Sequence, residues 1–302
     1  MLDLILKNAK VYLEDRFVEG VSVGVQAGRI AAIAAPECMP EGVRTLDLTG
    51  EYLIPGTIDT HMHVRDPGHT ERGTFYTETM AAAAGGVTTI LEQPISVPPQ
   101  HNVEILERRI ARAEAQCVVD FAFYGAAGGE YLEDIAQLAA DGRIVAYKTF
   151  LHAPPEGREQ EFQGLTMADD AQLYAGMREL AKTGLFCAFH AENNDMIAAN
   201  IRRLRAEGRV SPEYHCVSRP TVAEVTSVER ILNFVRETGA RVEIAHVSCP
   251  EVMELLRQAK KDGLPVYVET CPHYLFLTEE DMVKFGPYAK CNPPVRSRAQ
   301  AE

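Results

Sequence analysis

From Thr57 onward, short apolar stretches alternate with amphipathic stretches, and this repeat constrains the fold more than any other feature of the chain. The apolar stretches are rich in Val, Ile, Phe and Tyr along their whole length, which is typical of parallel strands covered by helices. Several amphipathic stretches end at glycine, as helices do before the next strand. We expect strands over 57–64, 87–93, 118–124, 144–150, 185–191, 241–247 and 265–271. We expect helices over 74–84, 102–115, 131–140, 169–183, 221–238 and 251–262.

Repeated strand–helix units form either a doubly wound sheet or a (β/α)8 barrel. No Gly-x-Gly-x-x-Gly motif follows the first of these strands, which weighs against a dinucleotide-binding sheet. Candidate ligand residues stand at strand ends, and the carboxyl ends of the strands form the active site of a barrel. We therefore predict an α/β fold of the TIM (β/α)8 type. Seven strands can be counted, and the eighth strand of a closed barrel is missing.

The residues before this repeat have a different pattern. Short β-type stretches over 2–11, 21–25, 29–33 and 45–48 are separated by turns. They predict a small β-rich domain over 1–53, a partial β-sandwich. The barrel domain is then expected over 54–302, incomplete at its C-terminus.

Composition and charge exclude several classes of protein. A net charge of −13 argues against a nucleic-acid partner, which requires a basic face. No stretch reaches the roughly 18 consecutive apolar residues of a membrane span, and the N-terminus lacks the layout of a signal peptide. We therefore expect a cytoplasmic protein with no membrane partner. The seven cysteines are dispersed without a Cys-x-x-Cys pair, which indicates reduced thiols.

A His-x-His pair lies at the end of the first strand of the repeat. Residues two apart in a strand point to the same face, so His61 and His63 project together. Two imidazoles on one face are able to bind one divalent metal ion. The spacing alone is a weak signal, and the alternative is a solvated strand end.

Three further polar residues stand within or at the end of later strands. Lys148 lies in an apolar stretch, so its amine must be paired with an acid, exposed at the strand end or modified. Carbamylation by CO2 would make it an anionic oxygen donor able to bridge two metal ions. His190 and His246 each end an apolar stretch, where a single histidine is more often a core or loop residue. Four histidines and one lysine in this order favour a metal site.

These residues belong to longer motifs, among them Asp59-Thr-His-Met-His63 and Tyr147-Lys-Thr-Phe-Leu151. The further motifs lie at 82–89, 190–193, 218–220, 246–248, 269–275 and 290–296. As a set they resemble the cyclic amidohydrolase branch of the amidohydrolase superfamily. This branch comprises allantoinases, dihydroorotases and hydantoinases or dihydropyrimidinases. The resemblance covers nearly the whole chain, and allantoinases are the most similar.

The resemblance implies hydrolysis of the C–N bond of a cyclic ureide or imide at a binuclear metal centre, usually of zinc. His61 and His63 would hold the first metal ion, His190 and His246 the second, and carbamylated Lys148 would bridge them. Two divalent cations beside one water lower its pKa toward neutrality and polarise the amide carbonyl. The implied partner is a small cyclic amide, and the implied full-length protein is a homodimer or homotetramer.

The general base of the family has no counterpart in its expected place. In the family it is an aspartate at the end of the eighth strand, beyond the proline-rich loop. Here Asn292–Arg296 is followed by six residues, and Asp281 lies in a capping pattern typical of a helix start. We therefore expect a chain truncated at its C-terminus, with no catalytic base to be named. The alternative of another class is a catalytically impaired metal-binding remnant or scaffold.

The ring substrate stays open between the three activities. Arg65 resembles the arginine with which dihydroorotases bind a substrate carboxylate. Hydantoinases carry a tyrosine where this chain has Ala153, and the loop at 93–98 is closer in layout to that of allantoinases. The candidate substrate contacts are Arg65, Ser96, His273 and Asn292. Four histidines without motif support are expected to be loop or surface residues: His69, His101, His152 and His215.

Overall fold

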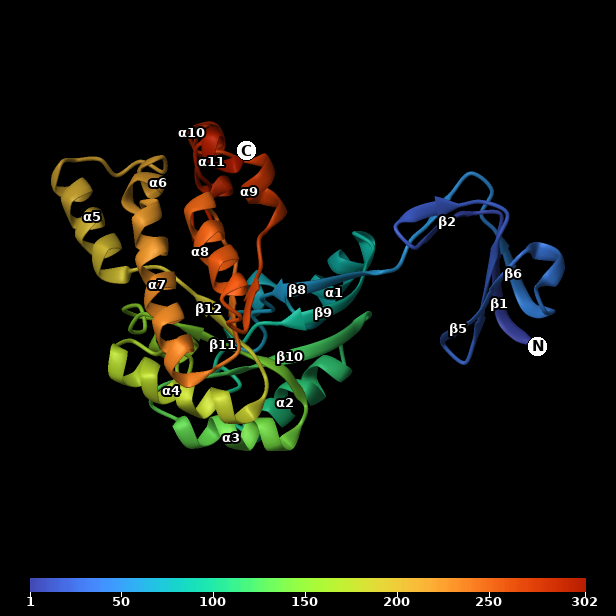
Figure 1. The fold of residues 1–302 in the computed structure, drawn as a ribbon, viewed down its shortest axis with the longest axis horizontal. Helices are drawn as coiled ribbons and strands as arrows, with labels where there is room; N and C mark the ends of the chain where they lie inside the picture. Colours follow the sequence, from blue (N-terminus) through green and yellow to red (C-terminus); the bar gives the residue numbers. More distant parts are fainter. The chain divides into compact units, whose positions relative to one another are not determined.

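The computed structural model describes residues 1–302. The chain divides into two compact units, Met1–Thr57 and Ile58–Glu302 (Figure 1). Every residue that the sequence predicts as a metal ligand belongs to the second unit. None of the helices is both long enough and apolar enough to cross a membrane.

The first unit is β-rich, as predicted. It contains a four-stranded sheet of order β5-β4-β1-β6 and a three-stranded sheet of order β3-β2-β7. Ala9, Val11 and Val23 are buried in its small core. The strand expected over 2–11 is divided near Asn8, where a φ of 66° turns the chain between β1 and β2. The strands are β1 (Leu2–Lys7), β2 (Lys10–Leu13), β3 (Arg16–Val18), β4 (Ser22–Gln26), β5 (Arg29–Ala34), β6 (Gly42–Asp47) and β7 (Tyr52–Leu53).

The second unit is built on a curled seven-stranded sheet, so the predicted barrel-type α/β fold and its seven strands are confirmed. The strands lie side by side in chain order from β8 to β14. The ladders that join β9 to β14 are all parallel, so these strands end at the same edge of the sheet. They are β8 (Thr57–Met62), β9 (Val87–Glu92), β10 (Asp120–Ala126), β11 (Ile144–Phe150), β12 (Cys187–His190), β13 (Val242–Ile244) and β14 (Val266–Val268).

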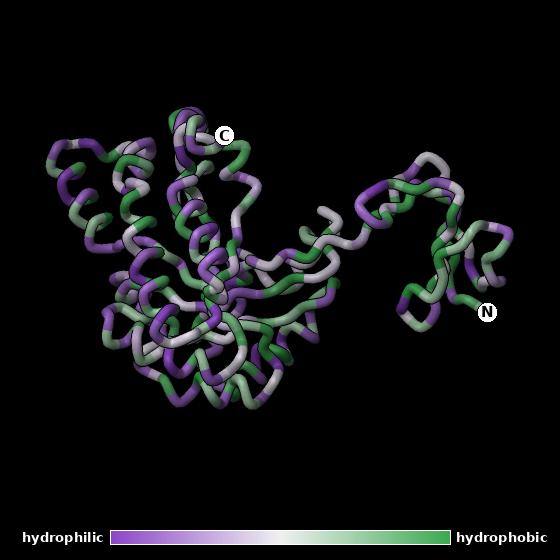
Figure 2. Tube along the Cα trace, viewed as in Figure 1, coloured by the Kyte–Doolittle hydropathy of each residue, from purple (hydrophilic) through white to green (hydrophobic).

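Six helices alternate with these strands close to the predicted positions. Helices α2, α3 and α4 lie along one face of the sheet (Figure 1). In Figure 2, β9 and β10 are largely hydrophobic, whereas the helices carry mixed colours, as expected of helices with one face toward solvent. The six are α1 (Phe75–Ala84), α2 (Val103–Glu114), α3 (Leu132–Asp141), α4 (Asp170–Thr183), α7 (Thr221–Thr238) and α8 (Pro250–Lys261).

The sequence analysis gave no range for five further helices, although the capping pattern at Asp281 indicated the start of α10. α5 begins after Asn193, whose side chain accepts a hydrogen bond from the backbone N–H of Met196. This is ordinary N-terminal capping by asparagine. α5 and α6 both lie between β12 and α7, where one loop was expected. The five are α5 (Asn194–Ala206), α6 (Tyr214–Ser218), α9 (Pro272–Phe276), α10 (Glu279–Phe285) and α11 (Arg298–Ala301).

The last strands of the sheet are shorter than the apolar stretches that predicted them. The chain leaves the ladder after β13 and turns at His246, which has a φ of 44°. This is the left-handed region, which residues other than glycine rarely adopt. The residues that follow β13 are still apolar because they stay buried, although they no longer pair in the sheet. A prediction from apolar composition therefore places the end of the strand too late.

Alternation along β11 and β12 separates two environments. Tyr147 and Phe189 belong to the main core, formed between the sheet and its helices. Ala146 and Ala188 belong to a separate buried cluster on the other face. Lys148 and His190 each follow one of these alanines by two residues, so they share that second face.

A buried ion pair ties the first strands of the sheet together. Glu92, the last residue of β9, is fully buried and accepts hydrogen bonds from Nε and Nη2 of Arg109 on α2, at 3.2 and 2.5 Å. The same Nη2 donates to the carbonyl of Val64 at 2.9 Å. Gln100 donates to Glu92 and to the carbonyl of Tyr124, at 3.1 and 2.8 Å. The network therefore fixes the backbone directly after His63.

Replacing Arg109 by methionine is expected to lower the free energy of unfolding by about 3–5 kcal/mol, because it leaves the buried carboxylate of Glu92 without its charge partner. Urea unfolding followed by circular dichroism measures the change. Arg108→Met is the matched control, since the Arg108 side chain is 68% exposed and its loss should change stability by less than about 0.5 kcal/mol. Equal effects of the two substitutions would contradict this assignment.

Candidate active site

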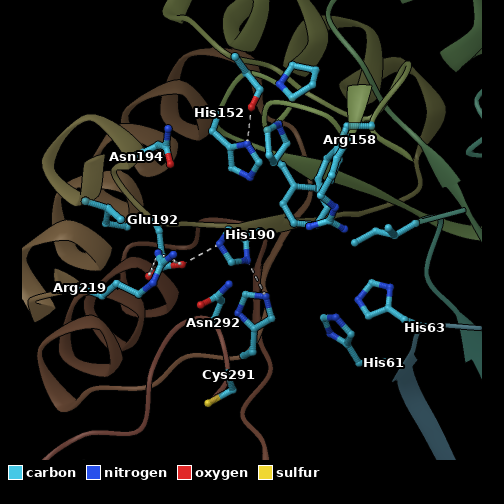
Figure 3. A pocket seen from close by; sticks show the side chains of 18 of the residues that line it. His61, His63, His152, Arg158, His190, Glu192, Asn194, Arg219, Cys291 and Asn292 are labelled. Atoms are coloured by element: carbon cyan, nitrogen blue, oxygen red, sulfur yellow. Dashed lines mark hydrogen bonds and ion pairs between the residues drawn. The ribbon is translucent and has the colours of Figure 1, made fainter. Parts of the chain in front are cut away.

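A cavity of about 730 Å3 lies at the carboxyl ends of the strands of the second unit (Figure 3). His61 and His63 reach it from the end of β8, Phe150 from β11 and His190 from β12. Further lining residues follow β13 and β14: His246, Cys271 and His273. Parallel strands place their carboxyl ends at one edge, and residues distant in sequence meet there for that reason.

His61 and His63 lie beside each other, with ring centroids 5.2 Å apart. The Nδ1 of His61 is 2.7 Å from a carboxylate oxygen of Glu269, which follows β14. The Nδ1 of His63 is buried and has no hydrogen-bond partner. Burial lowers the pKa of both histidines, most strongly that of His63. Both rings are therefore held toward the neutral form, which is the form that binds metal ions.

Glu269 connects two of the histidines and was not singled out by the sequence analysis. Besides His61, it accepts a hydrogen bond from the backbone N–H of His246 at 3.0 Å. Burial alone would raise the pKa of Glu269, but the hydrogen bond from His61 and the nearby Lys148 outweigh it and lower the pKa. Glu269 thus acts as an ionised carboxylate that orients one imidazole and the backbone at another.

Lys148 is fully buried, and its amine has no hydrogen-bond partner. The Nζ lies 5.4 Å from the centroid of the Phe150 ring. Burial lowers the pKa of Lys148 to about 8, against the opposing effect of Glu269 and Glu243. Of the three states that the sequence left open, acid pairing and exposure at the strand end are both absent here.

His190 and His246 line the same cavity, with ring centroids 4.8 Å apart. The Nδ1 of His190 is 3.1 Å from the Nε2 of His246, and its Nε2 is 2.9 Å from a carboxylate oxygen of Glu192. The ring of Phe150 stacks on His190 at 5.1 Å, which fixes the plane of the imidazole. The Nδ1 of His246 is buried without a partner.

The chemistry of this donor set fits a divalent metal centre. Three buried nitrogens lack partners, those of His63, Lys148 and His246, and such orphaned polar atoms are rare in protein interiors. No group of three or more His, Cys, Asp or Glu side chains is already spaced to hold a metal ion. The imidazoles instead bond to each other and to Glu192 and Glu269. The structure thus gathers the predicted ligands without arranging them for coordination.

Two loops carry a cluster of charges to the cavity wall. Glu161, itself buried, accepts hydrogen bonds from Nε and Nη2 of Arg158 at 2.8 and 2.6 Å. It also lies 3.4 Å from a guanidinium nitrogen of Arg65 and 3.3 Å from Nε2 of His69. The hydrogen bonds from Arg158 lower the pKa of Glu161 to about 2. Arg65 and Arg158 line the cavity and are both anchored on this one carboxylate.

The structure brings three of the four predicted substrate contacts to the cavity: Arg65, His273 and Asn292. Ser96 is the exception and does not line the cavity. Its side chain is buried outside the lining, and its hydroxyl donates to the carbonyl of Pro98 at 2.9 Å. The loop conformation turns this hydroxyl back onto its own backbone, which no motif reveals.

The four histidines without motif support have different roles. His152 follows β11 in a loop, as expected, but it also lines the cavity, with its Nδ1 2.7 Å from the carbonyl of Ala153. His69 belongs to the cluster around Glu161. His101 is buried, and its Nδ1 lies 2.8 Å from Asp134. His215 lies on α6, and its Nε2 is 2.9 Å from the carbonyl of Cys291.

Of two further acidic residues, one has the role that its sequence pattern predicts and the other was missed. Asp281 caps α10, as its sequence pattern predicts, by accepting a hydrogen bond from the backbone N–H of Thr278 at 2.9 Å. Glu192 was missed as a cavity residue, although its position in the motif after His190 carried the signal. Arg158 and Arg219 were also missed, because nothing in a loop sequence shows which way its arginines point.

Comparison with known proteins identifies the family of this chain. Residues 52–282 match the Amidohydrolase family. The chain belongs to this family. This amidohydrolase is 35% identical to an allantoinase of Bacillus licheniformis over 99% of its own length and 66% of the relative's. It is also 35% identical to an allantoinase of Deinococcus radiodurans, with 100% and 65% covered. The predicted resemblance to cyclic amidohydrolases is confirmed, with several allantoinases among the relatives.

Solved structures agree with the sequence relatives. The L-hydantoinase (dihydropyrimidinase) from Arthrobacter aurescens superimposes with a TM-score of 0.92 at 33% identity, covering 100% of this chain and 65% of that one. The chain spans about two thirds of the length of the curated relatives it matches. The region shared with them includes the whole cavity described above.

Glu161→Gln is expected to destabilise the amidohydrolase by about 2 kcal/mol at neutral pH, after allowance for the partial exposure of Arg158. The pKa of Glu161 is lowered from 4.5 to about 2, so its contribution is present above its unfolded pKa and is lost as pH falls toward the folded value. Urea unfolding at several pH values should show the difference between variant and wild type shrinking below about pH 4.5.

Glu130→Gln serves as the control, because it makes the same chemical change at an exposed side chain. Its substitution should change stability by less than about 0.5 kcal/mol. A difference for Glu161→Gln that is constant between neutral and acidic pH would show that the carboxylate is not held ionised by the two arginines.

Proposed function

We propose that this protein hydrolyses a C–N bond in the ring of a cyclic amide, with a cyclic ureide such as allantoin as the preferred substrate. The observation that carries the proposal is a cavity lined by His61, His63, His190 and His246. The buried amine of Lys148 lies close enough to lower the pKa of three of these histidines. The relatives named allantoinase and L-hydantoinase support the same reaction class. Dihydroorotase and hydantoinase or dihydropyrimidinase activities are the alternatives within this class.

The residues fit two divalent metal ions, for which zinc is the first choice because imidazole suits it. His61 and His63 would hold one ion, and His190 and His246 the other. When bound, such ions activate a water molecule and polarise the amide carbonyl. Carbamylated Lys148 would bridge them: its nitrogen bonds to the carbon of CO2 and releases one proton. The resulting anion gives metal partners to a buried group that otherwise has none.

Protein side chains at the cavity wall would hold the ring. Arg65 is fixed from behind by Glu161, so its remaining N–H groups are available to carbonyl oxygens of a substrate. His273 has an Nε2 without a partner and lines the same cavity, as does Asn292. These three side chains offer the donors and acceptors that a ureide ring requires. Their contribution is orientation, which lowers the entropy cost of reaction.

A metal-binding scaffold without hydrolytic activity is the second candidate. It is favoured by the contacts of Glu192, the buried carboxylate that lines the cavity. Glu192 is bonded to His190 at 2.9 Å and lies 3.4 Å from Arg219, so it is already engaged and is poorly placed to accept a proton from water. The two candidates differ in turnover and agree on metal binding.

Metal content tests the part that both candidates share. After incubation with zinc and desalting, the wild-type chain is expected to retain about two metal ions, measured by atomic emission. Lys148→Met should retain less than half of this amount, because the bridging group is lost. Lys182→Met is the control, since the Lys182 side chain is 64% exposed and remote from the motifs, and it should match the wild type. A wild-type chain that retains no metal would refute both candidates.

Turnover separates the two candidates. The zinc-loaded protein is incubated with allantoin, hydantoin, dihydrouracil or dihydroorotate, and ring opening is followed by chromatography. We expect the highest kcat/KM with allantoin and no ring opening by Lys148→Met. Retained metal without opening of any ring would favour the scaffold, and a preference for another ring would replace allantoin as the substrate.

A further inference from the structure

Arg296 forms a buried network behind the cavity that the proposed reaction does not use. Its guanidinium has a partner for each nitrogen. Nε donates to the hydroxyl of Ser248 at 2.9 Å, Nη2 to a carboxylate oxygen of Glu224 at 2.9 Å and Nη1 to the carbonyl of Arg219 at 2.5 Å. Arg296, Glu224 and Ser248 are all buried. An arginine fork that satisfies three separate segments fixes their relative positions.

One arm of this network leads to His246. Ser248 follows His246 by two residues, and both its backbone N–H and its hydroxyl donate to the carboxylate of Glu224, the former at 3.0 Å. His246 itself has a φ of 44°. A non-glycine residue keeps such a backbone conformation only where the surroundings over-determine it. Arg296 and Glu224 supply that constraint from the C-terminal side of the histidine.

The other arm leads to His190. Arg219, whose carbonyl is held by Arg296, directs its side chain to Glu192, with Nη1 3.4 Å from both carboxylate oxygens. Glu192 in turn bonds to Nε2 of His190 at 2.9 Å. Figure 3 shows Arg219, Glu192 and His190 in this sequence, with Asn292 beside them. One loop carries both Asn292, which lines the cavity, and Arg296.

We propose that Arg296 is a positioning residue that sets the orientations of His190 and His246 together, and thereby the affinity of the centre for a divalent metal ion. The effect on metal affinity rests on the proposed function, whereas the effect on the orientation of the two histidines does not. Arg296 contacts neither histidine directly and acts through Arg219–Glu192 on one and Ser248–Glu224 on the other. Partners of this kind typically change metal affinity by about 10–100-fold when they are lost.

Arg296→Lys separates positioning from folding. A lysine keeps the positive charge beside Glu224, so the buried carboxylate is not left unpaired. It cannot form the fork, so the hydroxyl of Ser248 and the carbonyl of Arg219 lose their shared donor. We expect the urea midpoint to stay near the wild-type value while zinc affinity, measured by competition with a chromophoric chelator, falls by about 10-fold or more.

Ring signals of the metal-free protein provide a readout independent of metal. In protein carrying 15N-histidine, the ring nitrogen shifts of His190 and His246 are expected to move together in Arg296→Lys. Those of His69, outside the network, should not move. Unchanged shifts of both histidines in a variant that folds like the wild type would overturn the proposal.

Arg219→Gln tests one arm alone and keeps the proposal falsifiable if Arg296→Lys does not fold. It removes the contact with Glu192 and leaves the carbonyl that Arg296 binds. The Nε2 shift of His190 should move most, because Glu192 bonds to that nitrogen, whereas His246 is reached only through its contact with Nδ1 of His190. An unchanged Nε2 shift of His190, or a larger change at His246 than at His190, would overturn the two-arm arrangement.

The control substitution is Arg298→Lys, two residues beyond Arg296 and exposed. It should change neither the zinc affinity nor the ring shifts. If the wild-type chain binds no zinc but its ring shifts respond as described, the metal centre is wrong and the positioning role stands. If zinc binds and Arg296→Lys changes neither affinity nor shifts, the proposed function stands and the positioning role is wrong.

Discussion

The parallel ladder is the constraint on which the rest of this structure depends. It aligns the carboxyl ends of neighbouring strands and gives every second residue the same face. Register places Lys148 opposite Ala188 and Phe150 opposite His190. Side chains 42 residues apart in the sequence (148 and 190) thereby share one surface. The site needs no long-range motif to assemble, because backbone hydrogen bonds between strands already determine which residues meet.

Much of this arrangement could be predicted from sequence because it follows from local pattern. Apolar stretches that alternate with amphipathic ones identify the curled sheet, and histidines where those stretches end identify the cavity. The residues that escaped prediction come from loops. Ser96 turns to its own backbone, whereas His152 and Arg158 turn to the cavity. A loop side chain is directed by tertiary contacts, and those leave no period in the sequence.

Four carboxylates hold arginine and histidine side chains in position in and behind the cavity. Glu269 holds His61, Glu192 holds His190, Glu161 holds two arginines, and Glu224 holds Arg296. In each case the acid is mostly buried and its partner reaches the cavity or a neighbour of it. This division lets the groups that face a substrate be exposed while their orientation is fixed from behind. It also explains how a chain of net charge −13 presents a cavity wall rich in arginine.

The left-handed backbone at His246 has a consequence for how this position tolerates change. A side chain in that conformation costs about 1–3 kcal/mol that a glycine would not. Stability and function therefore make opposite demands at this position. Substitution of His246 by glycine would relax the backbone but remove an imidazole from the proposed metal centre. Screens that select only for thermal stability should favour that loss, and screens that select for activity should restore the histidine.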